Sequence, residues 1–321
     1  MRKALIVGIN DYPGSHLDGC ENDAREISSL LQKHDDGSRN FDIKTDLSIR
    51  TKGELKGKIK ALFSGGNDIE LLYFSGHGHC DKTGGYLVTP DYAINDWGVS
   101  MKDILKMAND SSSTNRIVIF DCCYSGSMGT SPINQSISEI GKGVTILTSS
   151  RDTEISEEID GHGVFTALLL EALKGGAANI LGDITPGSIY AYIDQSLGTW
   201  HQRPIFKTNI SKFVSLRKAK SRVSFDDLKM LLKCFDNENS VFSLDPSFEF
   251  TNKPDYENKT IKPYADDDNV NTFKVLQRLE SVDIVEPVKE EHMYFAAMKS
   301  GGCRLTPIGK YYWKLLVNNR I

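Results

Sequence analysis

Two short segments of the sequence carry the residue types of a cysteine nucleophile and its base. His77 lies in the segment SGHG, and two adjacent cysteines, Cys122 and Cys123, lie in DCCYSG. A thiol attacks as its thiolate, and a neighbouring imidazole favours that form and later protonates the leaving amine. The glycines beside these residues allow backbone N–H groups to come close to a developing oxyanion. Together the segments predict a Cys–His pair for acyl transfer.

The hydrophobic pattern of residues 1–210 predicts strands that alternate with helices. The expected strands are Lys3–Gly8, Phe41–Thr45, Ile69–Ser75, Arg116–Cys122, Val144–Thr148 and a short Ile205–Lys207. The expected helices are Asn22–Lys33, Thr51–Phe63, Gly163–Leu173 and Ser188–Leu197, and Cys80–Trp97 is expected to be a loop. This order predicts a mostly parallel sheet covered on both faces. The working residues of such sheets follow the carboxyl ends of strands, where both chemical segments fall.

The C-terminal third predicts a second, smaller domain. Residues 211–222 contain Lys and Arg but no acid, which is typical of a basic linker or exposed arm. The polar segment Asp236–Asn269 is expected to be a long loop. The apolar residues that follow predict a helix, a turn, two strands, the second at Tyr294–Met298, and a closing helix over Leu305–Leu316. That order resembles a winged helix, so residues 223–321 are expected to form an α+β regulatory or interaction domain.

Composition and charge narrow the classes of function. The 321 residues are 39% hydrophobic and 25% charged, with a net charge of −5, which does not favour a global nucleic-acid binder. Residues 211–321 hold 18 Lys and Arg against 16 Asp and Glu, so DNA reading is the weaker expectation there. No apolar run approaches the roughly 18 residues of a membrane span. Six scattered cysteines without a CxxC pair predict reduced thiols, a cytoplasmic location and no zinc site.

The motifs resemble the caspase and metacaspase peptidases of family C14. SGHG is followed by DCCYSG, and His77 precedes Cys123 by 46 positions, against about 50 in caspases. Further segments similar to the family are LDGCENDA at Leu17–Ala24, Ile146–Glu158, His162–Leu173 and the QRP at Gln202. The resemblance covers roughly residues 1–210. It implies a caspase-like three-layer sandwich around a six-stranded sheet, and cysteine endopeptidase activity.

The resemblance also implies roles for individual residues of the catalytic pair. In the metacaspase pattern D-x-C-x-S-G the nucleophile is Cys123, and His77 is its general base and acid. Strand alternation agrees in part, since Asp121 and Cys123 point to one side and Cys122 to the other. Cys122 is then a small buried apolar residue. The backbone N–H groups of Gly78 and Cys123 would hold the oxyanion.

Three further residues match the positions that metacaspases use to bind a basic P1 side chain. They are Asp23 of the GCENDA segment, Ser75 of SGHG and Asp121 of DCC. Two carboxylates and a hydroxyl suit a guanidinium or ammonium group, because charge-assisted hydrogen bonds are strong. The expected partner is therefore a protein substrate with Arg or Lys at P1. His79 and His162 are expected to be structural or loop residues.

Control of the activity is the least determined part of the sequence. Lys142 and Arg151 are the basic candidates for processing around the segment 126–143. Only three acids lie within Cys80–Trp97, so we expect no metal site and no cofactor, with calcium left open. An activating protein or ligand is expected at the C-terminal domain, with family analogy alone pointing to stress or antiviral defence. The alternatives are a catalytically silent scaffold and a nucleic-acid-sensing module.

Overall fold

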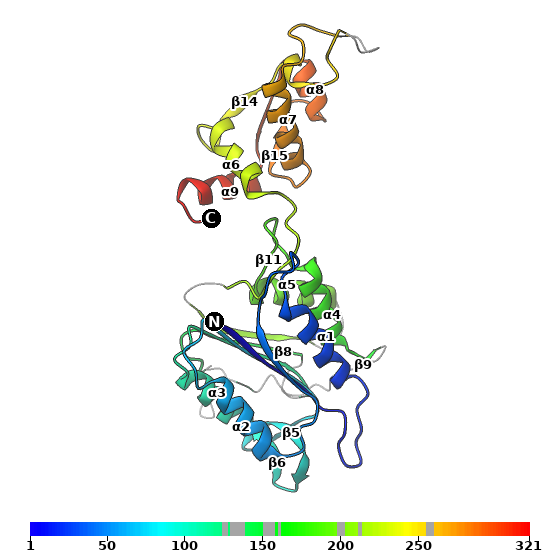
Figure 1. Cartoon of the computed structure of the whole chain (residues 1–321), viewed down its shortest axis with the longest axis vertical. Helices are drawn as coiled ribbons and strands as arrows, with labels where there is room; N and C mark the ends of the chain where they lie inside the picture. The colour runs from blue at the N-terminus through cyan, green and yellow to red at the C-terminus, as the bar shows by residue number, and fades with distance from the viewer. Residues whose placement is uncertain are drawn as a thin grey trace. The chain divides into compact units, whose positions relative to one another are not determined.

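The chain forms two compact units, described here from a computed structural model. The structure describes residues 1–123, 128, 139–149, 158–159, 162–197, 203–210, 214–254 and 260–321. The first unit is Met1–Lys220 and the second is Ser221–Ile321. Each unit has its own sheet and its own helices (Figure 1).

The first unit is built on a six-stranded sheet with the order β12-β8-β7-β3-β1-β2. Its strands are β1 (Arg2–Gly8), β2 (Asp42–Asp46), β3 (Ile69–Ser75), β7 (Asn115–Asp121), β8 (Val144–Thr148) and β12 (Ile205–Asn209). Every neighbouring pair is parallel except β12 with β8, which is antiparallel. The predicted mostly parallel six-stranded sheet is therefore confirmed.

Helices cover both faces of this sheet, as the sequence pattern requires (Figure 1). On one face lie α1 (Cys20–Gln32), α4 (Val164–Glu171) and α5 (Pro186–Leu197); on the other lie α2 (Lys52–Leu62) and α3 (Met101–Asp110). Successive side chains of β3 point to opposite faces of the sheet: Tyr73 belongs to the core on the α1 side and Phe74 to the core on the α2 side. Both faces of the sheet are thus buried, as in other α/β proteins.

The segment expected to be a loop after His77 instead forms a small antiparallel sheet. Its strands are β4 (Gly78–Asp81), β5 (Gly84–Ala93) and β6 (Asp96–Ser100). Leu87 and Val99 are paired across β5 and β6 and are both fully buried against the main core. Tertiary burial of these few apolar residues, rather than a long periodic pattern, determines the strands.

The residues expected to form an exposed basic arm are in part packed onto the first unit. Here β13 (Arg217–Lys218) pairs with β11 (Asp183–Ile184), and the Arg217 side chain is buried. Its guanidinium donates to the carbonyl oxygens of Leu30 and Leu173 at 3.0 Å. Unpaired carbonyls at helix ends need donors, and Arg217 supplies them. The expectation of an exposed arm is therefore wrong for Leu216 and Arg217, whereas the Lys218 side chain is exposed.

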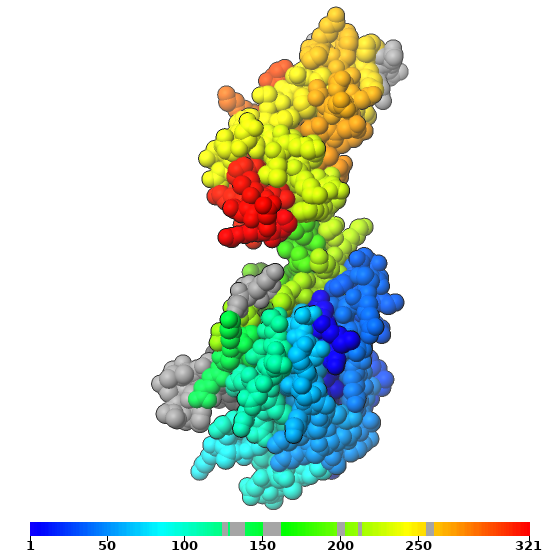
Figure 2. Space-filling view, turned by 60° about the vertical axis from the view of Figure 1, so that its left-hand side comes forward, coloured from blue at the N-terminus to red at the C-terminus, as the bar shows by residue number. Residues whose placement is uncertain are grey.

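The second unit combines a three-stranded sheet with helices. Its elements are α6 (Phe225–Cys234), β14 (Val241–Ser243), the 3₁₀ helix η3 (Pro246–Phe248), α7 (Asp267–Glu280), β15 (Val285–Pro287), α8 (Met293–Met298), β16 (Gly302–Leu305) and α9 (Pro307–Val317). The strand order is β14-β16-β15. Figure 2 shows α9, in red, at the surface of this unit. The winged-helix assignment stays a prediction.

Two expectations for the second unit are wrong. Tyr294–Met298 is not a strand but part of α8, because Met293, Ala296 and Ala297 are buried at helical spacing. The segment expected to be a long loop contains β14, η3 and the start of α7.

None of the helices in the described ranges has both the length and the apolarity needed to cross a membrane.

Candidate active site

The two chemical segments meet at the carboxyl ends of β3 and β7. In the parallel register Ser75 lies opposite Asp121, and the N–H of Gly76 donates to the Asp121 carbonyl at 3.3 Å. Two residues further, Gly78 lies so close to Cys123 that an added Cβ would stand 2.0 Å from the Cys123 carbonyl oxygen. Only glycine fits at this position. The structure thus brings the residue after His77 directly against Cys123.

His77 is held by the turn that follows β1. Its Nε2 lies 2.8 Å from the Ser15 carbonyl oxygen and 3.0 Å from Ser15 Oγ. A carbonyl oxygen only accepts hydrogen bonds, so Nε2 carries a proton. The neutral ring therefore has its lone pair on Nδ1, and Nδ1 is the atom that can take a proton from a thiol. The residue type of Ser15 could not predict this contact with His77, because the main-chain carbonyl of Ser15 makes it.

Tyr12 supports His77 from the core side. The two ring centroids are 4.6 Å apart in an edge-to-face arrangement. The Tyr12 hydroxyl accepts from the His77 N–H at 3.1 Å and donates to the Val88 carbonyl at 3.3 Å. Gly76 leaves room for that hydroxyl, since an added Cβ would lie 2.5 Å from it. The imidazole is thus fixed through its ring, its backbone and its Nε2.

The N–H of Gly78 points away from its neighbouring strand. Gly78 is paired with Leu87, and the Val88 N–H donates to the His77 carbonyl at 2.9 Å. Hydrogen-bonded and non-hydrogen-bonded pairs alternate along an antiparallel ladder, so the bond between Val88 and His77 makes the next pair, Gly78 and Leu87, a non-hydrogen-bonded pair. In such a pair each N–H points outward from the partner strand. The ladder therefore does not use the Gly78 N–H, and its role toward the oxyanion stays a prediction.

The two adjacent cysteines have different surroundings. Cys122 is 1% exposed and belongs to the core on the α2 side of the sheet. Cys123 is half-buried at the end of the segment. This difference fits a packing role for Cys122 and leaves Cys123 as the predicted nucleophile.

The three residues predicted to bind a basic side chain lie together at the carboxyl ends of β3 and β7, next to the first turn of α1. Asp23, Ser75 and Asp121 are all buried, and Ser75 Oγ donates to Asp23 Oδ2 at 3.1 Å. Asp121 Oδ2 accepts from the N–H of Thr166 at 3.2 Å and from its hydroxyl at 2.7 Å. Thr166 was not expected from its sequence position. It lies in the first turn of α4, where backbone N–H groups favour an anion.

His162 joins this cluster although it was expected to be a structural or loop residue. Its Nδ1 lies 2.7 Å from Asp23 Oδ1. It belongs to β10 (His162–Gly163), directly before α4. An added Cβ at Gly163 would lie 2.3 Å from Asp121 Oδ2, so this glycine lets the backbone approach the carboxylate. One short segment therefore borders both acids.

The carboxyl of Asp23 is electrostatically strained. Burial, followed by repulsion from Asp121, raises the pKa of Asp23 to about 6, although His162 and Ser75 act in the opposite direction. Burial together with the same two acids also raises the pKa of Tyr73 well above its usual value. Two buried carboxylates side by side favour a cationic guest, because it removes their mutual repulsion.

The predicted processing residues are described in part. Lys142 is an exposed turn residue before β8, and its carbonyl accepts from Arg116 Nη2 at 2.7 Å. Arg151 lies outside the described residues. In the part of the chain that the structure describes, no group of three or more His, Cys, Asp or Glu side chains is arranged to hold a metal ion. Processing and any calcium requirement stay predictions.

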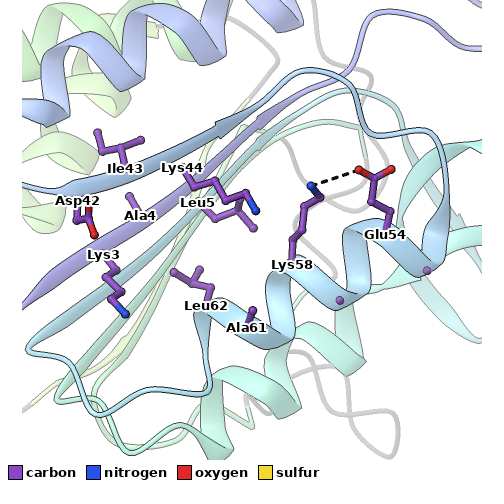
Figure 3. Close-up of a pocket in the computed structure, with 12 residues that line it drawn as sticks. Lys3, Ala4, Leu5, Asp42, Ile43, Lys44, Glu54, Lys58, Ala61 and Leu62 are labelled. Atoms are coloured by element: carbon purple, nitrogen blue, oxygen red, sulfur yellow. Dashed lines mark ion pairs between the residues drawn. The ribbon is translucent and has the colours of Figure 1, made fainter.

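A separate hollow of about 550 Å³ lies between α2 and the strands β1 and β2 (Figure 3). It is lined by Lys3 and Leu5 of β1 and by Lys44 of β2, together with the ion-paired Lys58 and Glu54 of α2. Lys3 and Leu5 lie in the first half of β1, whereas Gly8 at its carboxyl end is opposite Ser75. The hollow is therefore not the candidate active site.

Comparisons with known proteins agree with this architecture. The model of the caspase domain of peptidase family C14 matches residues 1–214. Metacaspase-3 of Trypanosoma cruzi is 28% identical over 145 residues, which are 39% of this chain and 40% of that protein. The structure of protein GSU0716 from Geobacter sulfurreducens shares the fold with a TM-score of 0.50 and 18% identity, covering 68% of this chain and 100% of that one. The chain belongs to the caspase-domain family, peptidase family C14.

Proposed function

We propose that the protein is a cysteine endopeptidase that cleaves proteins after Arg or Lys, with His77 and Cys123 as its catalytic pair. Membership of the caspase-domain family and the similarity to a metacaspase support a cysteine peptidase in general. The observation that carries the finer proposal is the meeting of the two segments at one sheet edge, with Gly78 against Cys123 and two buried carboxylates beside them.

The chemistry follows from the orientation of His77. Its Nδ1 takes the proton of the Cys123 thiol, and the thiolate attacks the scissile carbonyl carbon. The N–H groups of Gly78 and Cys123 donate to the oxygen on which negative charge develops. When the C–N bond breaks, the imidazolium gives its proton to the leaving amine. Water, deprotonated by the same imidazole, then hydrolyses the thioester and restores the thiol.

The preference for a basic P1 residue rests on Asp23, Ser75 and Asp121. A guanidinium or ammonium group placed between the two carboxylates would relieve the repulsion that raises the pKa of Asp23. A P1 aspartate would add a third negative charge to the same buried space. Protein substrates with Arg or Lys at P1 are therefore the proposed partners.

We assign regulation to the second unit. Twelve of the fourteen exposed large apolar side chains in the described part of the chain belong to Ser221–Ile321, and only Met1 and Ile94 belong to the first unit. This enrichment of exposed apolar side chains supports a docking function more than DNA reading. An activating protein or ligand would bind there. A biological role in stress or antiviral defence is proposed by analogy with the family alone.

A panel of fluorogenic peptides tests the proposal. Peptides with Arg, Lys or Asp at P1 are incubated with wild type, Cys123→Ala and the matched control Cys122→Ala, with and without calcium. We expect Arg and Lys peptides to be cleaved, Cys123→Ala to lose roughly 1,000-fold or more in kcat/KM, and Cys122→Ala to keep most activity. Faster cleavage after Asp would disprove the pocket assignment. The absence of any Cys123-dependent turnover, with or without calcium and once a missing activator is excluded, would favour a silent scaffold.

A further inference from the structure

One further residue of the protein contacts the cluster that is proposed to bind the P1 side chain. Asp23 Oδ1 accepts from His162 Nδ1 at 2.7 Å, while Asp23 Oδ2 accepts from Ser75 Oγ at 3.1 Å. Asp23 is 1% exposed, so water does little to solvate its charge. The His162 side chain is about one-fifth exposed and stands at the edge of the cluster.

We propose that His162 is a specificity-determining residue of this pocket: its hydrogen bond holds Asp23 ionised and oriented beside Asp121, so that the pocket keeps two negative charges for a cationic P1 side chain. This inference rests on the proposed function and adds a residue that touches the substrate-binding carboxylate from the side opposite Ser75.

The physical argument begins with the two acids. Buried carboxylates that lie close together do not both ionise readily, and one of them tends to take up a proton. A neutral Asp23 would lose most of its attraction for a guanidinium. Donors that bind the ionised form oppose this, and here Thr166 serves Asp121 while Ser75 and His162 serve Asp23. Among the described donors to Asp23, His162 makes the shortest contact and is the one that can carry a positive charge.

The surroundings of His162 are compatible with both of its protonation states. Its Nε2 lies 3.0 Å from Asn22 Nδ2 and 3.6 Å from Glu26 Oε1. In the neutral ring Asn22 donates to Nε2, whereas in the imidazolium Glu26 balances the charge. Nδ1 donates to Asp23 in either state. Among the residues that the structure describes, the other titratable groups that face Asp23 are Asp121 from β7 and Tyr73 from β3.

A competing role for His162 makes the opposite prediction. If His162 merely blocked Asp23 against the substrate, its removal would free an acceptor and strengthen the binding of a basic P1 side chain. The sign of the change in KM therefore distinguishes the two roles.

The kinetic test compares P1-Arg with P1-citrulline peptides, which have the same shape but differ in charge. His162→Ala is expected to raise KM for the Arg peptide about tenfold, the effect of one lost charge-assisted bond, and to change kcat little. The pH range over which KM decreases as pH rises should also lie higher in this variant. His162→Asn, whose amide nitrogen can take the place of Nδ1, should restore most of the preference. His292→Ala in the second unit is the matched control. A KM that falls or stays unchanged in His162→Ala overturns the inference.

A second measurement is independent of catalysis. The Asp23 carboxyl is titrated by ¹³C NMR in Cys123→Ala and in the double variant with His162→Ala, with Asp23→Asn to assign the signal. The inference predicts a higher midpoint without His162, and an unchanged midpoint overturns it. If the midpoint is higher without His162 but the wild-type enzyme does not prefer Arg peptides, the His162–Asp23 coupling is upheld and the proposed specificity is overturned.

Discussion

The two sides of the active-site edge are built on different physical principles. On the His77 side, neutral dipoles and tight backbone packing fix the geometry, through Tyr12, the Ser15 carbonyl and Gly78. On the Asp23 side, buried charges are held near one another by a few donors. The first side should therefore be sensitive to added volume, and the second to pH. Substitutions on each side test this contrast.

The largest effect is expected for Gly78→Ala on the His77 side. The new Cβ would lie 2.0 Å from the Cys123 carbonyl oxygen, and neither backbone segment can move without displacing His77 or Cys123. We expect kcat/KM for an Arg peptide to fall by roughly 100-fold or more, as when an oxyanion-hole donor is lost. Steady-state kinetics together with a thermal unfolding curve separate this loss from a loss of folded protein.

Gly57→Ala in α2 is the matched control for that substitution. An added Cβ at Gly57 meets no atom within 4 Å, and alanine favours a helix over glycine by about 0.5–1 kcal/mol. This variant should keep full activity and unfold at a slightly higher temperature. Equal activity of the two variants would show that the contact of Gly78 with Cys123 has no importance for the reaction.

An intermediate effect is expected from the pH dependence of stability on the Asp23 side. The folded-state pKa of about 6 lies above the usual value of 3.8, so between about pH 4 and 6 the folded chain holds a proton that the unfolded chain releases. Stability contributed by this carboxyl therefore decreases as pH rises through that window. Relative to Asp23→Asn, the free energy of unfolding of wild type should fall by up to about 3 kcal/mol.

Chemical denaturation at pH 4, 5, 6 and 7 measures this difference. Because Asp23 and Asp121 interact, the midpoint belongs to the pair rather than to one residue. A difference between wild type and Asp23→Asn that stays constant across the range, or that grows in favour of wild type as pH rises, would contradict the view of Asp23 as a strained carboxyl.

The smallest effect is expected for Tyr12→Phe, again on the His77 side. The variant keeps the ring against His77 but leaves the His77 N–H and the Val88 carbonyl without this hydroxyl, at a cost of roughly 1–3 kcal/mol of stability. We expect kcat to fall about tenfold, since small displacements of a catalytic base are costly. Tyr190→Phe in α5 is the control, because its stacking on Phe206 at 5.3 Å is retained. Full activity of Tyr12→Phe would show that the hydroxyl does not position His77.

The sequence predicted the central strands β3, β7 and β8 well because they are buried along their whole length. The run Ile69–Ser75 is mostly apolar, with Glu70 and Ser75 as its only polar members, and this signal does not depend on distant partners. Short or half-buried elements were harder to predict. Tyr294–Met298 is too short for its period to distinguish helix from strand, and β4 to β6 gain their apolar contacts from the main core.

The sequence by itself determined the fold class, the carboxyl edge and the residue types placed there, because strand periodicity and two glycine-rich motifs are local properties. Only the tertiary structure decided which atoms work together. The Ser15 carbonyl reaches His77 across 62 positions, and His162 reaches Asp23 across 139. Contacts of this kind depend on how the loops pack over the sheet edge. The sequence does not predict them, because neither a main-chain group nor a single histidine indicates its distant partner.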